Sequence, residues 1–287
     1  MERIKVVLIL GSGHNGGTLT DLLLDSHSQL LCIGEFHAGR ASSVCSCGKP
    51  APECVVWQKA LGPQPWREQG IFKKKLDYLL DRGSYLCAKG APVPVDEGEF
   101  TASNLAIFRT LLADRKKSII VDSSKEVERA EVLAKSPDIE PIIIHMVRDG
   151  RGSTWTYIAK YKRVFPYFYM WALSNLKAEV LRRRFRRLTG GRGKFIYVRF
   201  SDLVNEPEKT LRLLCKEIGV EYEPAMLRFD EHEHHQIEGN RTRFVKGHAI
   251  YPDTKPREMP LRLRAPFMFL FGWLNFFYRH RRTGVVA

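Results

Sequence analysis

The chain has 287 residues, 44% of them hydrophobic and 27% charged, which are ordinary values for a globular protein large enough to form one α/β domain. No apolar run reaches the roughly 18 residues that a membrane-spanning helix requires, and no signal peptide is evident, so we expect a cytoplasmic protein. The 46 Lys and Arg residues exceed the 32 Asp and Glu residues and give a formal net charge of +14, which predicts an anionic partner such as a nucleic acid, a membrane surface, a polyanionic glycan or a multiply phosphorylated cofactor.

The N-terminal segment predicts a buried strand that leads into an anion-binding loop. An apolar run at Ile4–Leu10 is followed by several glycines and then by a helical pattern. Backbone N–H groups gather at such a helix N-terminus and bind phosphate-like anions without any side chain. Gly11, Gly16 and Thr18 fit the phosphate-loop pattern GxxxxGK[ST], but Gly17 stands where that pattern has lysine. That lysine reaches the β- and γ-phosphates of a nucleotide, so its absence argues against ATP as the ligand.

Residues 39–92 are irregular and rich in turns, which predicts a lid or insertion rather than a separate domain. Three of the six cysteines in the chain have a spacing that resembles zinc ligands: Cys45, Cys47 and Cys54. Cys32 or His37 would supply the fourth ligand, but the spacing is not that of a standard zinc finger. We therefore prefer a loop of reduced thiols. A disulfide framework is not expected in a large basic chain without a secretion signal.

Three further apolar runs predict strands that are buried on both faces, with helices between them. The runs are Ser118–Val121, Pro141–Val147 and Lys194–Phe200, and the helical patterns are Ser103–Ala113, Glu126–Ala134, Pro166–Leu188 and Glu206–Ile218. Strands that alternate with helices imply a parallel sheet with right-handed crossovers, and hence an α/β three-layer sandwich. Ligands of such sheets bind beyond the carboxyl ends of the strands, where the glycine loop lies.

Polar residues follow the runs Ser118–Val121 and Pro141–Val147 of the predicted sheet. Asp122 is interpreted as a magnesium-binding carboxylate or a helix cap, and Lys125 as a cation that faces a ligand. Arg148 leaves the next strand, and the hydroxyl residues Ser153 and Thr156 follow on helical turns. An arginine with a hydroxyl group makes a good phosphate clamp, although a capped helix start with a surface salt bridge is the alternative. Two anion sites at the ends of parallel strands suggest a nucleotide that is phosphorylated at both ends.

Several ordered blocks between residues 6 and 244 resemble the superfamily of sulfotransferases that use 3′-phosphoadenosine 5′-phosphosulfate (PAPS). GSGHNGGTLTDLLLDSHSQLLCIGE resembles the 5′-phosphosulfate loop, HMVRDGRGSTWT the 3′-phosphate segment, and YVRFSDLVNEPEKTLRLLCKEIGVEY the strand, turn and helix that members write as R-Y-E-D-L-x-x-x-P. The CSCG…ECVVW loop and GNRTRF resemble features of bacterial members. The resemblance implies one sulfotransferase domain over residues 1–287, with a phosphate-loop-like phosphosulfate-binding loop. It also implies PAPS as donor, its desulfated form PAP as product, an acceptor hydroxyl and no required metal.

The resemblance also assigns donor-binding positions. The 5′-phosphosulfate loop comprises Gly13, His14, Asn15, Gly16, Gly17 and Thr18. Arg148 and Thr156 would hold the 3′-phosphate, with Ser153 as the competing hydroxyl. Phe200 stands at the position of an adenine-contacting tyrosine, and Arg243 is a candidate for closing over the nucleotide.

Catalytic roles follow from the resemblance in the same way. Glu35 stands where carbohydrate- and tyrosine-modifying members have a glutamate base, and His37 is the second candidate base. A carboxylate paired with Arg40 is the alternative for Glu35. Many members have lysine or arginine where this chain has His14, so Lys125 is the second candidate for neutralising the departing phosphate.

The acceptor is expected to be a hydroxyl on a carbohydrate or glycolipid, because the base is a glutamate and the surface is basic. A small molecule or a tyrosine is the alternative acceptor. A phosphate-loop kinase or nucleotide hydrolase is the alternative enzyme class. A nucleic-acid-binding module is the third hypothesis, but no motif for it is found and nucleic acid is not an expected partner.

The C-terminal segment, about residues 261–287, is both apolar and basic. PFMFLFGWLNFFY at Pro266–Tyr278 is too short to span a bilayer and lies between arginine clusters. It predicts a peripheral membrane contact through residues 266–282, a buried helix that closes the core, or a dimer contact. Tyr161–Trp171 is a second aromatic stretch, interpreted as acceptor pocket or core. The cluster Glu231–His235 is expected to be a solvated loop rather than a zinc site.

Overall fold

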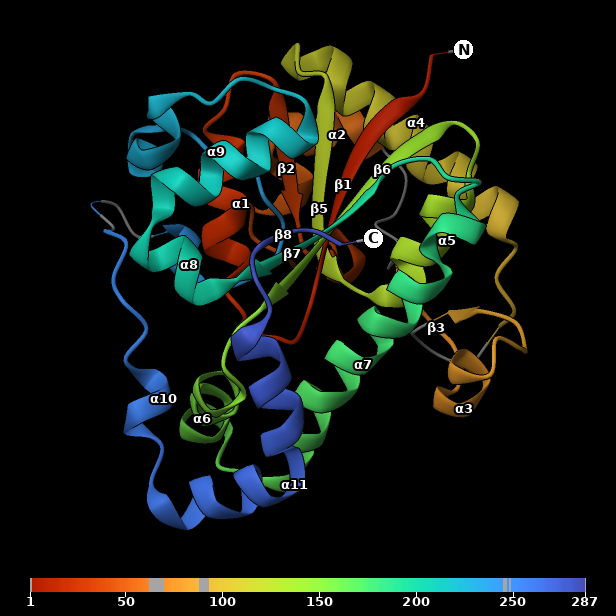
Figure 1. Ribbon diagram of the computed structural model, residues 1–287. Coiled ribbons are helices and arrows are strands. Elements are labelled where there is room, and N and C mark those ends of the chain that lie inside the picture. The colour runs from red at the N-terminus through yellow and green to blue at the C-terminus, as the bar shows by residue number, and fades with distance from the viewer. Residues whose placement is uncertain (1, 62–69, 88–92, 245–246, 248, 287) are drawn as a thin grey trace.

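The computed structural model describes residues 2–61, 70–87, 93–244, 247 and 249–286 (Figure 1). Its main sheet has six strands: β1 (Ile4–Leu10), β2 (Leu30–Gly34), β5 (Ile119–Lys125), β6 (Ile139–Val147), β7 (Lys194–Arg199) and β8 (Gly284–Val285). The strand order is β2-β5-β1-β6-β7-β8, and every neighbouring pair is parallel except β7 with β8. The predicted parallel sheet is therefore confirmed, with one short antiparallel strand at its edge.

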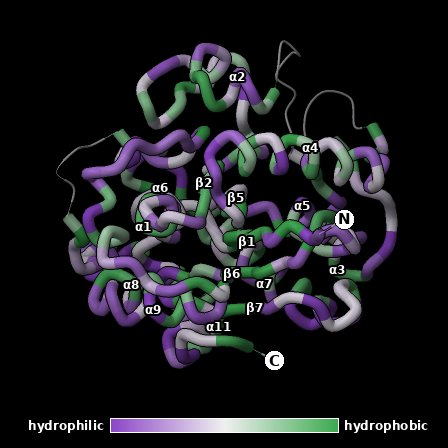
Figure 2. Tube along the Cα trace, turned by 90° about the horizontal axis from the view of Figure 1, so that it is seen from above, coloured by the Kyte–Doolittle hydropathy of each residue, from purple (hydrophilic) through white to green (hydrophobic). Residues whose placement is uncertain are grey.

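Helices cover both faces of this sheet, as the view in Figure 2 shows. One layer contains α1 (Gly17–Asp25), α8 (Phe200–Asn205) and α9 (Pro207–Ile218), and the other contains α2 (Val55–Leu61), α4 (Glu97–Arg115), α5 (Val127–Lys135) and α7 (Phe165–Leu188). Because both faces are covered, the strands are apolar along their length and do not alternate with polar residues. The three-layer α/β sandwich expected from the sequence is thus confirmed.

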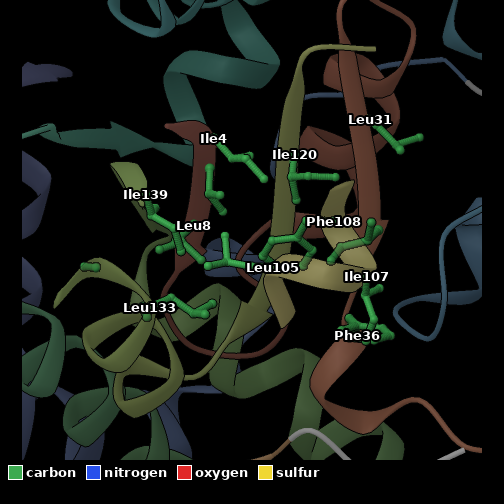
Figure 3. Close-up of a cluster of buried hydrophobic side chains, with 14 of the residues drawn as sticks. Ile4, Leu8, Leu31, Phe36, Leu105, Ile107, Phe108, Ile120, Leu133 and Ile139 are labelled. Atoms are coloured by element: carbon green, nitrogen blue, oxygen red, sulfur yellow. The ribbon is translucent and has the colours of Figure 1, made fainter. Parts of the chain in front are cut away.

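The central strand β1 sends side chains alternately into two hydrophobic clusters. Val6 and Leu8 pack with residues of α4 and α5, whereas Val7 and Ile9 pack with residues of α1 and α9. Figure 3 shows the first cluster, in which strand residues such as Leu8 gather with Phe108 of α4. Burial of a side chain such as Phe108 contributes about 1.5–3 kcal/mol, so this packing fixes the sheet that carries the loops.

The C-terminal part lies beyond the carboxyl ends of the strands, together with α6 (Gly150–Tyr161) (Figure 1). It contains α10 (Lys255–Glu258) and α11 (Leu261–His280). The buried face of α11 contributes Phe267 to a cluster with Trp171 of α7. The buried side of α11 therefore closes a core. This was one of the three predictions for the C-terminal segment, beside a membrane contact and a dimer contact. Among the described residues, no helix is both long enough and apolar enough to cross a lipid bilayer.

The observed elements differ from the expected ones mainly at their ends. The strand expected at Ser118–Val121 continues to Lys125 as β5, and the strand expected to reach Phe200 ends one residue earlier, because Phe200 begins α8. Helix α4 begins at Glu97, where the carboxylate of Asp96 accepts the first free backbone N–H groups. An apolar pattern alone does not reveal a cap that lies seven residues before the expected start at Ser103.

The insertion expected at residues 39–92 contains short elements in its described parts. They are the 3-10 helix Ala51–Glu53, helix α2, strand β3 (Ile71–Phe72), helix α3 (Lys75–Leu79) and strand β4 (Leu86–Cys87), and β3 pairs with β4. Residues 62–69 and 88–92 lie outside the described residues. Of its described parts, α2 packs against α4, β3 against α5 and α3 against α7.

Asp122 does not cap a helix, because it lies inside β5, and its pairing with a guanidinium argues against the magnesium interpretation. Its buried carboxylate in β5 accepts a hydrogen bond of 2.9 Å from Nε of Arg129 and another from the backbone N–H of Ser124. The guanidinium of Arg129 also donates to Asn104, so this buried carboxylate is fully engaged in fixing α4 and α5 against the sheet.

Candidate functional site

The glycine-rich turn between β1 and α1 is held open by one buried side chain. The Asn15 amide donates to the carbonyl of Met146 in β6 at 3.0 Å, and its oxygen accepts from the backbone N–H of Gly17 at 3.1 Å. Gly16 has φ of 101°, and a Cβ there would lie 2.2 Å from the ring of Phe200. Only glycine fits this position. Asn15 is therefore a brace of the loop, and its fully buried side chain is directed toward β6 and the backbone of Gly17.

Lys125 brings a positive charge to this loop from another strand. It is the last residue of β5 and has a left-handed backbone with φ of 62°. A Cβ built on Gly17 would lie 2.8 Å from Cε and 3.4 Å from Nζ of Lys125. The ammonium group of Lys125 thus lies beside the position that holds lysine in the phosphate-loop pattern, and Gly17 leaves the space for it.

Glu35 is the ion-pair partner of Lys125. It follows β2, and its carboxylate accepts a hydrogen bond from Nζ of Lys125. Both side chains are shielded, with exposed fractions of 26% for Glu35 and 12% for Lys125. Burial alone would raise the pKa of Glu35, but the ammonium of Lys125 outweighs that effect and holds the pKa below its ordinary value. Glu35 is therefore a carboxylate at neutral pH.

His14 carries no charge at neutral pH. Burial, reinforced by the positive charges of Lys160, Lys125 and Arg148, lowers the pKa of its imidazole to about 4. The ring lies edge-on to Tyr157 with 4.4 Å between their centroids. The positive charge next to the loop thus comes from neighbours such as Lys125 and Arg148, and not from the histidine that stands in place of the usual cation.

Arg148 joins the loop to the start of α6. Its guanidinium donates to the carbonyl of His14 at 2.9 Å and forms a two-pronged ion pair with Asp253, in which Nε lies 2.7 Å from Oδ2. It also lies 5.0 Å from the centre of the Phe200 ring. A carboxylate therefore fills the fork that was expected to hold a phosphate, and it shows that this fork accepts an oxyanion.

The two hydroxyl candidates on α6 differ in their partners. Thr156 donates to the carbonyl of Gly152 at 2.8 Å, as hydroxyls in helices often do. Ser153 is fully buried, and its Oγ has no hydrogen-bond partner among the described residues. Asp149 accepts from the backbone N–H of Arg151 and pairs with its side chain, so the capped helix start with a salt bridge is present next to Arg148.

A cavity of about 410 Å³ lies beside Arg148, at the carboxyl ends of β6 and β7. Five arginines line it: Arg148, Arg151, Arg199, Arg257 and Arg279. Asp149 and Asp253 offset part of this charge. A cavity of this size accommodates a nucleoside-sized anion. Neither Lys125 nor a residue of the glycine loop lines it, so Arg148 is the residue that this cavity shares with the loop site.

The segment around Gly239 covers the loop from the other side. The backbone N–H of Asn240 donates to Oγ1 of Thr18 at 3.1 Å. Arg243 does not face the loop. Its guanidinium donates to the carbonyls of Gln236, Glu238 and Val44, the last at 2.9 Å. The predicted closing residue therefore holds the covering segment in shape, while Thr18 and Asn240 make the contact.

Tyr157 is a site residue that sequence reasoning missed. A Cβ on Gly13 would lie 1.7 Å from its hydroxyl oxygen, so its side chain lies directly over the loop. Its ring stacks on Tyr167 at 4.7 Å and lies 6.1 Å from Tyr161. Its place one helical turn after Ser153 was the signal available in the sequence. In the aromatic stretch Tyr161–Trp171, Tyr161 and Tyr167 lie beside Tyr157, whereas Trp171 is buried in the core. The core interpretation is thus confirmed for Trp171, and the acceptor pocket stays a prediction.

Comparisons with known proteins agree with this geometry. A model of the sulfotransferase family matches residues 126–224. The fold is similar to the sulfotransferase domain of the olefin synthase of Synechococcus PCC 7002 (17% identity, 95% of each chain covered, TM-score 0.51) and to a sulfotransferase domain from the curacin biosynthetic pathway (16%, 96% of this chain and 98% of that one, 0.51). It is also similar to sulfotransferase STF9 from Mycobacterium avium (13%, 99% of this chain and 78% of that one, 0.51).

At these identities the solved structures establish a shared fold only. No curated protein matches the chain in sequence. The family model covers α5, β6, α6, α7, β7 and α9, which include Arg148 and the α6 hydroxyls. The resemblance found in the sequence is thereby confirmed: residues 126–224 match the sulfotransferase family model, and the fold is that of solved sulfotransferase domains.

Proposed function

We propose that the chain transfers a sulfuryl group from PAPS to an acceptor hydroxyl. The observation that carries this proposal is a pair of cationic anchors, Lys125 at the glycine loop and Arg148 at the start of α6. The glycine cradle at Gly16 and the unpartnered Oγ of Ser153 fit a ligand with one oxyanion at each end. In this proposal the main chain of Gly13–Thr18 holds the 5′-phosphosulfate, and Arg148 with Ser153 holds the 3′-phosphate.

Lys125, and not His14, is the proposed partner of the departing phosphate. Transfer breaks the bond from sulfur to the bridging phosphate oxygen, and negative charge develops on that oxygen. An ammonium in a shielded site stabilises such a charge, whereas a neutral imidazole contributes at most a hydrogen bond. The low pKa of His14, about 4, is the support for this assignment.

Glu35 is the proposed base. As the acceptor oxygen bonds to sulfur, the hydroxyl proton passes to the Glu35 carboxylate, which is ionised and lies next to the loop. Because Glu35 and Lys125 contact each other, a shift of Lys125 toward the leaving oxygen releases the carboxylate for this proton. Side chains act both as the base and as the partner of the departing phosphate, so the proposed reaction includes no metal.

The proposed acceptor is a hydroxyl on a carbohydrate or a lipid-linked glycan. Three neighbouring tyrosines lie beside the loop: Tyr157 stacks on Tyr167, and Tyr161 is tilted against both. They offer flat apolar faces with hydroxyl groups at their edges. Sugar rings present C–H faces and hydroxyls that match such a surface. A tyrosine or small phenol would also stack there, so both remain arms of the acceptor assay.

The exposed face of α11 supports a contact with an anionic lipid surface. Phe269, Trp273 and Phe276 lie along one side of the helix with exposed fractions of 87%, 62% and 63%. Arg262 lies two turns before Phe269 and is also exposed. Aromatic rings with neighbouring arginines suit the headgroup region of an acidic membrane, and a lipid-linked acceptor would be presented there. Cosedimentation with vesicles containing phosphatidylserine, but not with neutral vesicles, is expected; dimerisation through this face without lipid binding would contradict it.

The function is tested by incubating the purified chain with sulfur-labelled PAPS and separate acceptors. Labelled product is expected with glycans or glycolipids, and PAP is expected as the second product. If only tyrosine peptides or small phenols are labelled, the proposed acceptor class is refuted, but PAPS stands as the donor. Magnesium-dependent turnover of ATP, with no sulfate transfer to any acceptor, would replace the proposal with a nucleotide hydrolase or kinase.

A further inference from the structure

Three cysteines and one histidine meet at a point that the proposed reaction does not use. The thiols of Cys45, Cys47 and Cys54 and a ring nitrogen of His235 all lie within 4.8 Å of one another. We propose that these four side chains bind a structural Zn²⁺ ion. The fourth ligand is therefore neither Cys32 nor His37, because Cys32 lies in β2 and His37 lies 3.7 Å from the carboxylate of Glu126. His235 was also expected to be solvated, yet it is buried.

The distances suit tetrahedral zinc. Nδ1 of His235 lies 3.4 Å from Sγ of Cys54 and 3.8 Å from Sγ of Cys45. Bonds of about 2.3 Å from zinc to sulfur and about 2.0 Å from zinc to nitrogen place ligand atoms roughly 3.6 Å apart in a tetrahedron. Three thiolates with one imidazole are one of the usual ligand sets of structural zinc, and all four positions are then filled by the protein.

The backbone prepares the cluster for this role. A tight turn follows Cys45, in which the N–H of Gly48 donates to the Cys45 carbonyl at 2.8 Å and Gly48 adopts φ of 87°. The turn directs two thiols of a Cys-x-Cys pair to the same side. Cys54 is brought to them by the 3-10 helix Ala51–Glu53, which it ends. Zinc knuckles use the same kind of tight turn, because ligands that are close together in the sequence must all reach one ion.

The orientation of His235 is fixed from outside the cluster. Its carbonyl accepts a hydrogen bond of 2.7 Å from the indole N–H of Trp57. Nε2 of the ring lies 3.4 Å from a carboxylate oxygen of Glu233, on the side away from the sulfurs. A carboxylate beside the outer nitrogen is the usual second partner of a zinc-bound imidazole, since it fixes the tautomer that leaves Nδ1 free for the metal.

Charge also favours an ion at this point. Three thiolates and Zn²⁺ together carry one negative charge, and the guanidinium of Arg243 donates to the carbonyl of Val44, the residue before Cys45. Without a metal, three thiols and an imidazole would be buried with only weak hydrogen bonds between them. One disulfide would leave the third thiol over. The cluster is therefore suited to a metal more than to either alternative.

The ion would join two distant parts of the chain near the donor loop. It ties residues 45–57 to the segment 235–244, and that segment contacts the loop through Asn240 and Thr18. Zinc in this place is a positioning device for the cover of the phosphosulfate loop. Its loss is expected to reduce thermal stability strongly and affinity for PAP moderately, with no direct effect on the transfer step.

Metal analysis of the full chain tests this proposal. The chain is purified without a histidine tag, and its metal content is measured by elemental mass spectrometry. About one zinc ion per chain is expected. Cys47→Ser, which changes the least buried ligand, is expected to lose most of this zinc. Cys87→Ser, an exposed cysteine outside the cluster, is the matched control and keeps it.

Two measurements on the unmutated chain keep the proposal testable if Cys47→Ser fails to fold. Chelation should lower the melting temperature, and Co²⁺ added to the chelated chain should give the thiolate charge-transfer and visible bands of a tetrahedral site. A chain that contains no zinc and takes up neither Zn²⁺ nor Co²⁺ would overturn the proposal. A chain mass that is lower by two hydrogens because of a disulfide among these cysteines would also overturn it. A Cys47→Ser chain that keeps its full zinc content would do the same.

Discussion

Replacement of Lys125 by methionine removes the charge beside the loop and keeps the length of the side chain. Two unit charges about 4 Å apart interact by about 4 kcal/mol at an effective dielectric constant of 20, and Lys125 is shielded enough for this regime. Arg148 and the loop amides retain part of the stabilisation. We therefore expect kcat to fall by about 10²–10³-fold, the loss that removal of one oxyanion donor commonly causes.

The assay compares kcat for sulfate transfer with the affinity for PAP measured by calorimetry. Affinity should fall much less than kcat, because the charge on the bridging oxygen is largest during transfer. Loss of Lys125 should also raise the pKa of Glu35, so the acid limb of the pH–rate profile should move to higher pH. Lys135→Met is the matched control, since it breaks a lysine–glutamate pair with Glu97 outside the site.

A relocated lysine tests whether position, and not merely charge, is responsible. Gly17 lies in the first turn of α1 and lacks the positive φ of Gly16, so it tolerates a side chain once Lys125 is shortened. The double variant Gly17→Lys with Lys125→Ala should recover at least about tenfold of the kcat that Lys125→Ala alone loses. The reasoning is refuted if Lys125→Met keeps kcat within about twofold of the unmodified chain.

Three further changes have distinct expected results. Glu35→Gln should lower kcat by about 10²–10⁴-fold with little change in PAP affinity, and full activity would remove Glu35 from the mechanism. Asp253→Asn should tighten PAP binding by calorimetry, by about tenfold, because it frees the Arg148 fork, whereas weaker binding would show that Asp253 holds Arg148 in place. Burial holds the pKa of His145 at about 4, below its ordinary value, so the unfolded chain alone binds a proton as the pH falls from about 6.5 toward 4 and stability falls with it. His145→Gln should remove about 2 kcal/mol of the stability difference between pH 7 and pH 5 in thermal melts, and an unchanged slope would contradict the assignment.

Local sequence patterns were sufficient to predict the architecture and the glycine-rich loop between β1 and α1. Parallel strands buried on both faces must be continuous apolar runs, so β1, β6 and β7 were visible in the sequence. The run of glycines marked the turn between β1 and α1, and Arg148 was noted as the residue that follows β6. Strand β2 was missed because Leu30–Gly34 is short and lies directly after a helix with similar apolar residues.

Side-chain partners that are distant in the chain could not be predicted. Lys125 and Glu35 lie 90 residues apart, and Arg148 and Asp253 lie 105 apart. His235 meets Cys54 from 181 residues away, so its role as a fourth ligand had no local signal. The direction of Asn15 was equally hidden, since its position in the loop suits a ligand contact and a backbone brace alike. The fold determines which of these side chains meet, whereas the sequence pattern only indicates which residue types are available to pair.

The central claim is that the loop at Gly13–Thr18 and the guanidinium of Arg148 grip opposite ends of one nucleotide. A crystal structure of the chain with PAP tests it most directly. The account predicts the 5′-phosphate on the loop amides within reach of Lys125, and the 3′-phosphate on Arg148 in place of Asp253. PAP bound elsewhere, or no binding at millimolar concentration, would contradict it.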